Sequence, residues 1–545
     1  MTDKQPIFIL PENIQRMIGK DAQRNNILAA KMVADTVKTT LGPKGMDKML
    51  VSSIGDIIIT NDGVTILSEM EIEHPAAKML VEVAKTQEEA VGDGTTTAVI
   101  LAGKLLENAE KLLDQKIHPT AIVKGYRIAA EKSLSILEKL SKQVSAKDES
   151  LLKNVAMTAM TGKSAETAKE MFADIITKAV KQIMEQTESG ITVDMNNVKI
   201  EKIKGGGVED TELIEGIVVD KERAHIDMPS FVKNPKIALI DSALEIKSPE
   251  TDTKVSISSP EQLQAFLDQE EKTLKEMVEK VKKSKANVIF CQKGIDDIAQ
   301  YYLAKQGIYA VRRVNKSDME KLSKALGAKI ISNISELTEK DLGSAKIVEE
   351  IKKGDEAMTY VKGCSNPKAL TILIHGGTEH VVEEFERSIK DSLGDVSAAL
   401  QEGKIVAGGG AIEIELAKQL RKEVAIKGRE QLAVEQFADA IESIPKILAE
   451  NAGMDMIDTL TELKAKHDQG NSDAGLNLFT GKIEDALKSG IIEPLKIKTQ
   501  AIKSASEVAM MILRIDDVVA SGKAGGGAMP PGPMPGMGMG GMPEY

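Results

Sequence analysis

The sequence predicts a multi-domain protein that is mainly α-helical and carries an inserted α/β domain. Apolar residues recur at helical spacing over long stretches toward both ends of the chain, whereas the middle contains short β-branched runs between helical stretches. The length of 545 residues corresponds to about three or four domains at roughly 150 residues each. The order helical, α/β, helical is explained most economically by a middle domain inserted into a helical one whose two halves reunite.

The composition excludes several classes of protein. The chain has 71 Lys and Arg against 83 Asp and Glu, a net charge of −12, so it would repel the phosphates of nucleic acids. Aromatic residues make up only 3% of the chain, which leaves few platforms for stacking bases. No apolar run approaches the roughly 18 residues of a membrane span, and two cysteines cannot build a disulfide framework. We therefore expect a cytoplasmic protein that binds neither nucleic acid nor membranes.

In the first part of the chain, apolar residues at spacings of three and four predict a helix over residues 22–40. This helix ends at Leu41-Gly42-Pro43, because Gly and Pro together break a helix. The loop Asn61-Asp62-Gly63 opens another helix. Short strands are predicted near 49–51 and over 56–60, and further helices over 76–90, 96–113, 119–141 and 147–186.

The middle of the chain changes character, because β-branched runs alternate with helical stretches in a way that indicates parallel strand pairing. The strands are predicted at 236–241, 286–292, 308–314 and 328–332, and the helices at 294–305 and 316–327. After another β-branched run at 370–374, the chain returns to long helices as far as about residue 520. The end, 521–545, is rich in Gly, Pro and Met and is predicted to be a disordered tail.

One helix of the middle region has two interpretations. Ser259 and Pro260 are typical of the first positions of a helix, which is predicted to run to about Lys283. Apolar residues line one side of it, and Glu–Lys pairs at i,i+4 support the other. The helix either covers the sheet or projects as an arm whose apolar side meets partners.

Four turns have the chemistry of phosphate binding, although the chain has neither a GxxxxGK[ST] loop nor a GxGxxG motif. In the segment 92–97, Gly94 allows a ligand to approach closely, and the Thr hydroxyls and free N–H groups attract an anion. Asp93 alone would repel phosphate, but Mg²⁺ between them reverses the sign. The other three turns are 62–65, 41–43 and 408–410. Helix capping explains any one Asp turn, whereas the four together favour a site for Mg²⁺ and a nucleotide.

These turns, together with motifs elsewhere, closely resemble those of the group II chaperonins, and among them the archaeal thermosomes. The resemblance covers essentially the whole chain and rests on the combination of motifs rather than on one glycine-rich loop. The motifs are TLGPKGMDK at 40–48, TNDGVT at 60–65, GDGTTT at 92–97, GGG at 205–207, QKGIDD at 292–297, VAGGG at 406–410 and RIDD at 514–517.

The resemblance implies an equatorial ATPase domain built from both ends of the chain, an intermediate domain, and an inserted apical domain with a helical lid protrusion. It therefore favours the projecting arm for the helix that begins at Ser259. The implied boundaries are equatorial 1–146 and 405–522, intermediate 147–216 and 370–404, apical 217–369 with the protrusion at about 245–285, and a disordered tail at 523–545.

The resemblance also implies the residues of an ATP site. Asp93 corresponds to the Mg²⁺ ligand, and Asp62 and Asp391 correspond to the carboxylates that position the attacking water. Glu493 would accept hydrogen bonds from the ribose hydroxyls. The nucleotide is expected to contact Thr40, Leu41, Gly42, Pro43, Gly63, Gly94, Thr95, Thr96, Thr97, Lys163, Gly408, Gly409, Asn477 and Glu493.

Three further positions follow from the comparison with the family. Lys163 resembles the γ-phosphate sensor of group II members. Asn61 stands where bacterial chaperonins have Lys, so Mg²⁺, K⁺ or Lys163 must supply that positive charge. Ser392 follows Asp391 where many relatives have Ala, and it is small enough to leave the site undisturbed.

The implied function is that of an ATP-dependent chaperone, which encloses unfolded polypeptides in two stacked rings and closes a built-in lid on ATP hydrolysis. The rings would contain this chain alone or with paralogous subunits, and no separate lid protein is expected. The residues alone leave two alternatives open. A Mg²⁺–ATP-dependent phosphotransferase acting on a small acceptor would use the same loops, and a passive binding scaffold would use them only as helix caps.

Overall fold

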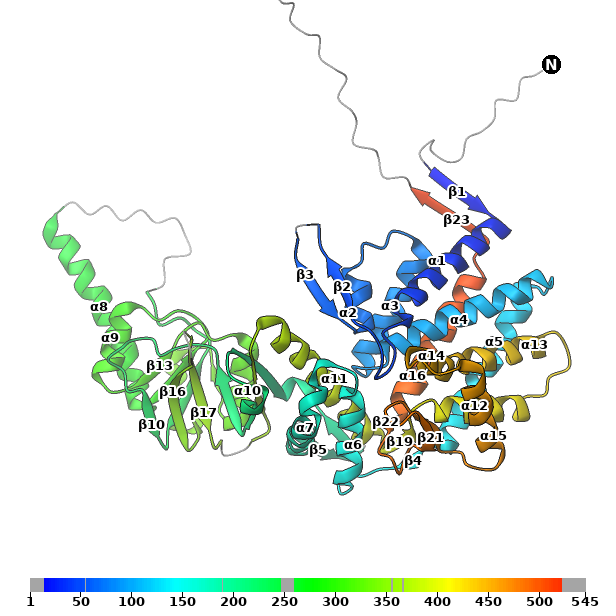
Figure 1. The fold of residues 1–545 in the computed structure, drawn as a ribbon. Helices are drawn as coiled ribbons and strands as arrows, with labels where there is room; N and C mark the ends of the chain where they lie inside the picture. The colour runs from blue at the N-terminus through cyan, green and yellow to red at the C-terminus, as the bar shows by residue number, and fades with distance from the viewer. Residues whose placement is uncertain are drawn as a thin grey trace, which may run out of the picture.

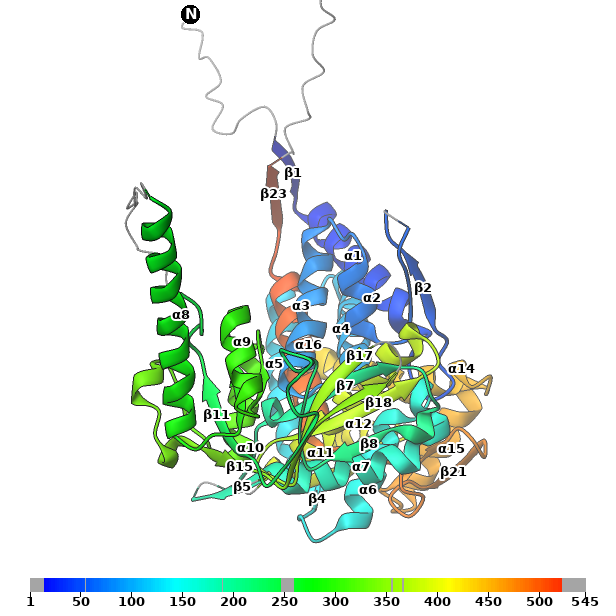
Figure 2. The ribbon, with the colours of Figure 1, turned by 90° about the vertical axis from the view of Figure 1, so that its left-hand side faces the viewer.

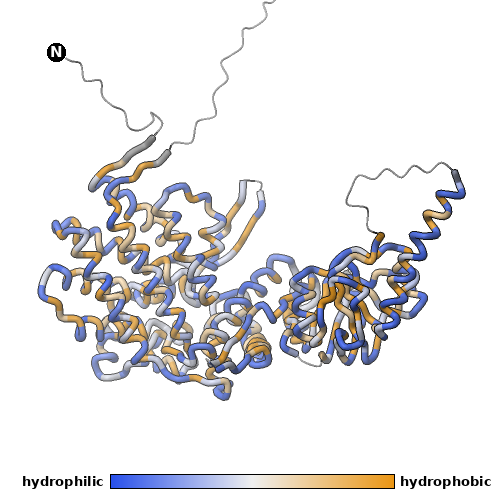
Figure 3. Tube along the Cα trace, turned by 180° about the vertical axis from the view of Figure 1, so that it is seen from behind, coloured by the Kyte–Doolittle hydropathy of each residue, from blue (hydrophilic) through white to orange (hydrophobic). Residues whose placement is uncertain are grey.

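The computed structural model describes residues 14–53, 55–188, 190–246, 259–353, 356–364 and 367–521. The chain forms three parts in a row: a helical part with α1–α5 and α12–α16, a central part with α6, α7 and α11, and an α/β part with α8–α10 (Figure 1). Each part has a hydrophobic core of its own, and the apolar stretches of the chain run through their interiors (Figure 3). No helix in the described ranges is long and apolar enough to span a membrane.

The helical part is built from both ends of the chain, whose residues share one core. Its middle is α4, which is buried along most of its length and packs against α1, α3, α13 and α16. Its helices are α1 (Lys20–Lys38), α2 (Gly63–Glu69), α3 (Pro75–Ala90), α4 (Thr95–Asp114), α5 (Pro119–Leu140), α12 (Ala411–Glu423), α13 (Glu430–Ile441), α14 (Ser443–Asn451), α15 (Met456–Asp468) and α16 (Leu495–Leu513). The predicted helices of the first 141 residues are therefore confirmed.

Two short antiparallel strand pairs and one three-stranded antiparallel sheet complete the helical part. They are β2 (Lys48–Val51) with β3 (Ile57–Thr60), β20 (Ala474–Asn477) with β21 (Lys482–Asp485), and β19 (Lys404–Ala407) between β4 (Lys142–Gln143) and β22 (Ile492–Pro494). The strands after residue 400 interrupt the region that we predicted to be only helical.

The first and last described elements lie side by side. β1 (Ile14–Ile18) pairs antiparallel with β23 (Asp517–Ser521), and the pair projects from the helical part (Figure 1). The backbone N–H of Gly19 donates to the carbonyl of Asp516 at the base of the pair. The predicted tail, 523–545, lies outside the described residues.

The central part corrects one prediction. The segment 147–186 does not form one helix, because α6 (Glu149–Met160) ends before a turn at Gly162, after which a short 3₁₀ helix (Ser164–Ala168) and α7 (Lys169–Ile183) follow. Gly162 has φ +80°, and a Cβ there would lie 2.4 Å from the Cα of Pro43. The remaining elements are β5 (Met184–Thr187) with β6 (Gly190–Val193), a sheet of β7 (Val198–Lys204), β18 (Leu370–Gly376) and β8 (Glu212–Ile214), and α11 (Glu379–Glu402).

The α/β part contains the predicted parallel sheet. β11 (Lys236–Ile240), β12 (Val288–Cys291), β13 (Tyr309–Val311) and β14 (Ile330–Ile331) pair in parallel in the order β13-β12-β11-β14, and α9 (Asp297–Lys305) and α10 (Lys316–Leu326) connect them. β15 (Gly343–Ser344) adds an antiparallel edge. A second, antiparallel sheet was not predicted; it contains β10 (Phe231–Lys233), β16 (Ile347–Lys353), β17 (Glu356–Lys362) and β9 (Gly216–Val219).

Helix α8 (Pro260–Lys283) extends beyond the rest of the α/β part in both views (Figures 1 and 2). Its N-cap is Ser259, whose side chain accepts from the backbone N–H of Gln262 at 3.3 Å. Toward its end, Leu274 and Val278 are buried, whereas Leu263, Phe266 and Leu267 are between 45% and 49% exposed. The start of α8 therefore projects with an uncovered apolar side, as the arm interpretation expected.

Candidate functional site

A cavity of about 350 Å³ lies between the helical part and the central part. Most of the predicted site residues line it, although they come from segments hundreds of residues apart. The predicted residues in its wall are Thr40, Leu41, Gly42, Pro43, Asp62, Asp93, Gly94, Thr95, Thr96, Thr97, Lys163, Gly409, Asn477 and Glu493. The other three predicted residues, Gly63, Gly408 and Asp391, do not line the cavity themselves but lie next to residues that do.

The start of α4 forms one wall of the cavity. Gly94 is the N-cap in a left-handed conformation, with φ +79°, and it provides no side chain to cap the helix. A Cβ at this position would lie 2.6 Å from Ile497, so only glycine fits. The side-chain amide of Gln87 holds the turn by donating to the carbonyl of Asp93 at 2.9 Å. The first-turn N–H groups of a long helix are thus free to bind an anion in the cavity.

The two carboxylate oxygens of Asp62 accept hydrogen bonds from different elements. As the N-cap of α2, it accepts through Oδ2 from the backbone N–H and the hydroxyl of Thr65, at 2.8 and 2.6 Å. Its Oδ1 accepts from the Thr95 hydroxyl at 3.3 Å. The capping interpretation is therefore correct for Asp62, and the same side chain also joins the two phosphate-type turns.

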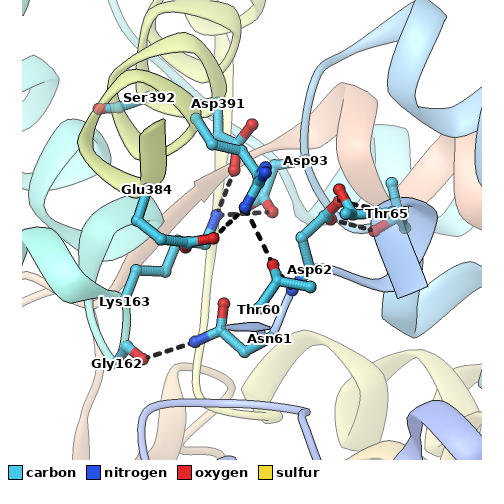
Figure 4. A network of polar contacts seen from close by, with 12 residues as sticks. Thr60, Asn61, Asp62, Thr65, Asp93, Gly162, Lys163, Glu384, Asp391 and Ser392 are labelled. Carbon is cyan, nitrogen blue, oxygen red and sulfur yellow. Dashed lines mark hydrogen bonds and ion pairs between the residues drawn. The ribbon is translucent and has the colours of Figure 1, made fainter. Parts of the chain in front are cut away.

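Lys163 connects the two parts of the chain inside the cavity (Figure 4). Its Nζ lies 2.6 Å from Oδ2 of Asp391 on α11 and 3.4 Å from Oδ1 of Asp93 before α4. The Asp391 side chain is only 5% exposed, and that of Lys163 is 18% exposed. A cation thus sits between the predicted metal ligand and one of the predicted water-positioning carboxylates.

The turn that carries Lys163 is held by the helical part. The side-chain amide of Asn61 donates to the carbonyl of Gly162 at 3.0 Å, and Gly162 packs closely against Pro43. Asn61 therefore does not supply the missing positive charge itself but positions the turn that brings Lys163 in. On the other side, Ser392 points away from the cavity and donates to the carbonyl of Ala156 at 3.1 Å, so it leaves the site undisturbed (Figure 4).

The cavity contains more acidic than basic groups, which changes their pKa values. Burial raises the pKa of Asp391 to about 7, against the lowering effect of the Lys163 ammonium. Burial also raises the pKa of Glu88 to about 8, and the charges of Asp391, Asp62 and Asp93 add to this effect. Burial alone would lower the pKa of Lys163, but the negative charges of Asp391 and Asp93 outweigh it and raise the pKa.

The opposite end of the cavity is less charged and is made by a glycine run and a hairpin. Gly409 packs so closely on β20 that a Cβ would lie 2.6 Å from the carbonyl oxygen of Leu476. Glu493 on β22 is paired with the buried Lys498 at 2.5 Å. The Asn477 side chain is engaged within its own hairpin, where Oδ1 accepts from the backbone N–H of Phe479 at 3.1 Å. Only part of the hydrogen-bonding capacity of Asn477 is therefore available to a ligand.

Three polar residues of this region were not predicted from the sequence. Asp395 lines the cavity one helical turn after Asp391, and Lys498 lies between Glu493 and the buried Glu413. Glu88 on α3 lines a neighbouring cavity, and the charges of Asp391, Asp62 and Asp93 act on it. The i,i+4 spacing of Asp391 and Asp395 was a signal for one shared helix face, whereas nothing in the sequence marked Lys498 or Glu88.

The carboxylates of the cavity fit a Mg²⁺ ion that is held jointly by the protein and by phosphate oxygens. Within the described ranges, no three His, Cys, Asp or Glu side chains are arranged to hold a metal ion by themselves. Asp62, Asp93 and Asp395 nevertheless line the cavity together with Lys163, and Asp391 is paired with Lys163 beside it. Magnesium in such sites is usually held by one or two carboxylates plus phosphate oxygens. Asp93, beside the anion-binding start of α4, meets that description.

Comparison with known proteins identifies the class. The family model of the TCP-1/cpn60 chaperonin family matches residues 33–523. The chain belongs to this family.

Among curated relatives, the chain is 58% identical to a thermosome subunit of Methanopyrus kandleri over 520 residues, covering 95% of each chain. It is 59% identical to a thermosome subunit of Pyrococcus horikoshii over 522 residues, again covering 95% of each. A solved structure, the open-state monomer of a group II chaperonin from Methanococcoides burtonii, superposes with a TM-score of 0.60 at 49% identity. It covers 78% of this chain and 100% of that one.

These relationships confirm the resemblance inferred from the motifs. They support an ATP-dependent chaperone of the group II chaperonin type. The alternative of a phosphotransferase with a small acceptor finds no support among them.

Proposed function

We propose that the cavity binds ATP with Mg²⁺ and hydrolyses it, and that hydrolysis drives a chaperonin cycle in which unfolded polypeptides are enclosed. One observation carries the proposal. Turns separated by hundreds of residues line a single cavity, with the free start of α4, Asp93 and Lys163 at one end and the glycine run with Glu493 at the other. This arrangement suits a triphosphate at the charged end and a nucleoside at the other.

Phosphoryl transfer to water requires positioning and neutralised charge rather than a covalent intermediate. The N–H groups and hydroxyls at the start of α4 would hold the phosphates, and Asp62 and Asp391 would orient the attacking water. Lys163, now paired with Asp391, would turn to the terminal phosphate. Mg²⁺ on Asp93 would supply charge neutralisation at the phosphate oxygens when it is bound, and K⁺ stays a candidate for a second cation.

The proposed coupling of hydrolysis to movement depends on where these groups are attached. Asp62 and Asp93 belong to the helical part, whereas Lys163 and Asp391 belong to the central part. Any opening between the two parts would separate Asp391 from the phosphate end, so closure and hydrolysis would occur together.

We infer that the three parts correspond to the domains of the family. Both chain ends, 1–146 and 405–522, would be equatorial, 147–216 with 370–404 intermediate, and 217–369 apical. The three largest hydrophobic clusters support this division, since each gathers its residues mainly from one of these sets.

We further propose that α8 belongs to a built-in lid, so that no separate lid protein is needed. The uncovered apolar residues at its start support a role in contacts between subunits or with clients. The chain would assemble, alone or with paralogous subunits, into two stacked rings in the cytoplasm.

The proposal is tested by measuring particle mass by light scattering and ATPase rate on the same sample. We expect a mass many times that of one chain and slow ATP turnover that requires Mg²⁺. A small oligomer, or a large particle without turnover, would contradict it.

Asp391→Ala provides the residue-level test. We expect it to keep ATP binding and to lose hydrolysis by a factor on the order of 10² or more. The matched control is Glu383→Ala, which removes an exposed carboxylate from the same helix and should leave turnover unchanged. Near-normal turnover in Asp391→Ala would refute its assignment.

A further inference from the structure

Asp395 is a buried carboxyl group in the cavity wall that the proposed ATPase mechanism does not use. It lies on α11, is 2% exposed, and lines the cavity. Its Oδ1 has no hydrogen-bond partner among the described residues. A buried polar atom without a partner is costly, and native proteins rarely leave one without a ligand, water or ion to satisfy it.

The backbone around Asp395 fixes the side chain in this position. The neighbouring Gly394 packs against the loop that leads into Asp93, and a Cβ there would lie 2.3 Å from the carbonyl oxygen of Val91. Asp391, one helical turn earlier, is held by Lys163. These two contacts hold α11 against the cavity, where Asp395 is 2% exposed.

The groups around Asp395 are mostly acidic, and they favour the protonated form of its carboxyl group. Burial raises the pKa of Asp395 well above its ordinary value, and the charges of Asp93, Asp391 and Glu493 add to this, against Lys163. Asp395 lines the same cavity as Asp93 and Glu493, which lie at its two ends. A carboxyl group that keeps its proton is a hydrogen-bond donor, whereas phosphate oxygens are acceptors.

We propose that Asp395 is a further nucleotide-contacting residue, which donates its carboxyl O–H to a phosphate oxygen of the bound nucleotide. This inference rests on the nucleotide site proposed above and assigns one more contact within it. Hydrogen bonds to charged acceptors are among the stronger ones, and the loss of one corresponds to about 10- to 100-fold in affinity.

The experiment measures the Kd of the assembled full chain for ADP with Mg²⁺ by calorimetric titration. Asp395→Asn keeps the shape and an N–H donor, so we expect affinity close to that of the unchanged protein. Asp395→Ala and Asp395→Leu remove the donor, and we expect both to bind ADP about 10- to 100-fold more weakly. Ser392→Ala is the matched control, since it removes a buried hydroxyl of the same helix that faces away from the cavity.

Each other outcome overturns the inference. Unchanged affinity in the donor-less variants would make Asp395 a bystander. An equal loss in Asp395→Asn and Asp395→Ala would make it a charged acceptor or cation ligand instead. If the unchanged protein binds no nucleotide, the proposed function fails, and the Asp395 contact fails with it.

A second measurement needs no variant that risks misfolding. The infrared C=O stretch of a protonated carboxyl group should shift when ADP binds to the unchanged protein, and the shifting band should be missing in Asp395→Asn. Absence of such a band, or its persistence in Asp395→Asn, would contradict the proposed hydrogen bond.

Discussion

Glu88 illustrates how the crowding of carboxyl groups in the cavity acts on a single side chain. It is half-buried on α3, and its pKa of about 8 reflects first burial and then the charges of Asp391, Asp62 and Asp93. A carboxyl group whose pKa is raised by folding binds a proton more tightly in the folded than in the unfolded state. Between the ordinary pKa and about 8, this group therefore makes the folded state less stable as the pH rises.

Glu88→Gln removes that dependence, because the amide does not ionise. We expect the melting temperature of the nucleotide-free variant to rise relative to that of the unchanged protein between pH 5 and 8, and the difference to level off above about 8. Thermal unfolding followed across this pH range provides the measurement. The exposed neighbour Glu89, changed to Gln, is the control and should give no such trend. A difference that stays constant with pH would show that Glu88 is not perturbed.

Most of the residues that the sequence singled out for the nucleotide site line one cavity, but the sequence did not indicate how they are paired. Asp62 and Asp93 were found because Asp-Gly-x-Thr turns have a local signature. Lys163 was named from the family resemblance, yet its pairing with Asp391 depends on two segments 228 residues apart. Asp395 was missed because its importance comes from burial, which depends on what packs around α11 and not on the residues beside it.

At the scale of elements, α8 has two halves in different environments. Leu274 is fully buried, whereas Leu263, Phe266 and Leu267 near the start are roughly half exposed. The same apolar stripe therefore stabilises the α/β part at one end and is available for contacts at the other.

Replacing Leu263, Phe266 and Leu267 together by Ser should leave the melting temperature of the subunit and its ATPase rate nearly unchanged. We expect the same variant to lose protection of an enclosed client chain against protease, if these residues make the lid contacts proposed above. Leu274→Ala is the control, and should destabilise the α/β part by about 2–5 kcal/mol. Early melting of the triple variant, or full protection of the client, would contradict this division of α8.

Several of the elements that were predicted incorrectly have a common physical cause. The helix expected over 147–186 is broken at Gly162, and periodicity alone gave no reason to end it there. The break exists because Gly162 must take φ +80° and fit against Pro43 of another part. In the antiparallel sheet, β16 and β17 form a local hairpin that was overlooked in the sequence. Its outer strands β9 and β10 join that hairpin by pairing over more than 100 residues, which no local pattern indicates. Local patterns identified the helices and the parallel strands, but not constraints that arise from tertiary contacts.

At the scale of the whole molecule, the three largest hydrophobic clusters lie in different parts, and among the described residues only a small cluster joins β7, β8 and β18 of the central part to β9 and β17 of the α/β part. We therefore expect that the parts need not unfold together. The cavity lies between the first two, and α8 belongs to the third region. Ligand binding stabilises only the structure that forms the binding site.

Calorimetry of the full chain should therefore show more than one thermal transition. We expect Mg²⁺–ADP at 100 times Kd to increase the unfolding free energy of the helical and central parts by about 2.7 kcal/mol and so to raise their transition temperature. The transition temperature of the α/β part should not change. The α/β transition is identified as the one that Leu274→Ala lowers. A single transition that moves as a whole with nucleotide would mean that the parts unfold as one unit.

The antiparallel pairing of β1 with β23 makes the described chain nearly a closed loop. The order in which its segments are encoded is then not essential to the fold. A circularly permuted gene, with the present ends joined and new ends opened in the exposed turn at 427–429 between α12 and α13, should specify the same subunit.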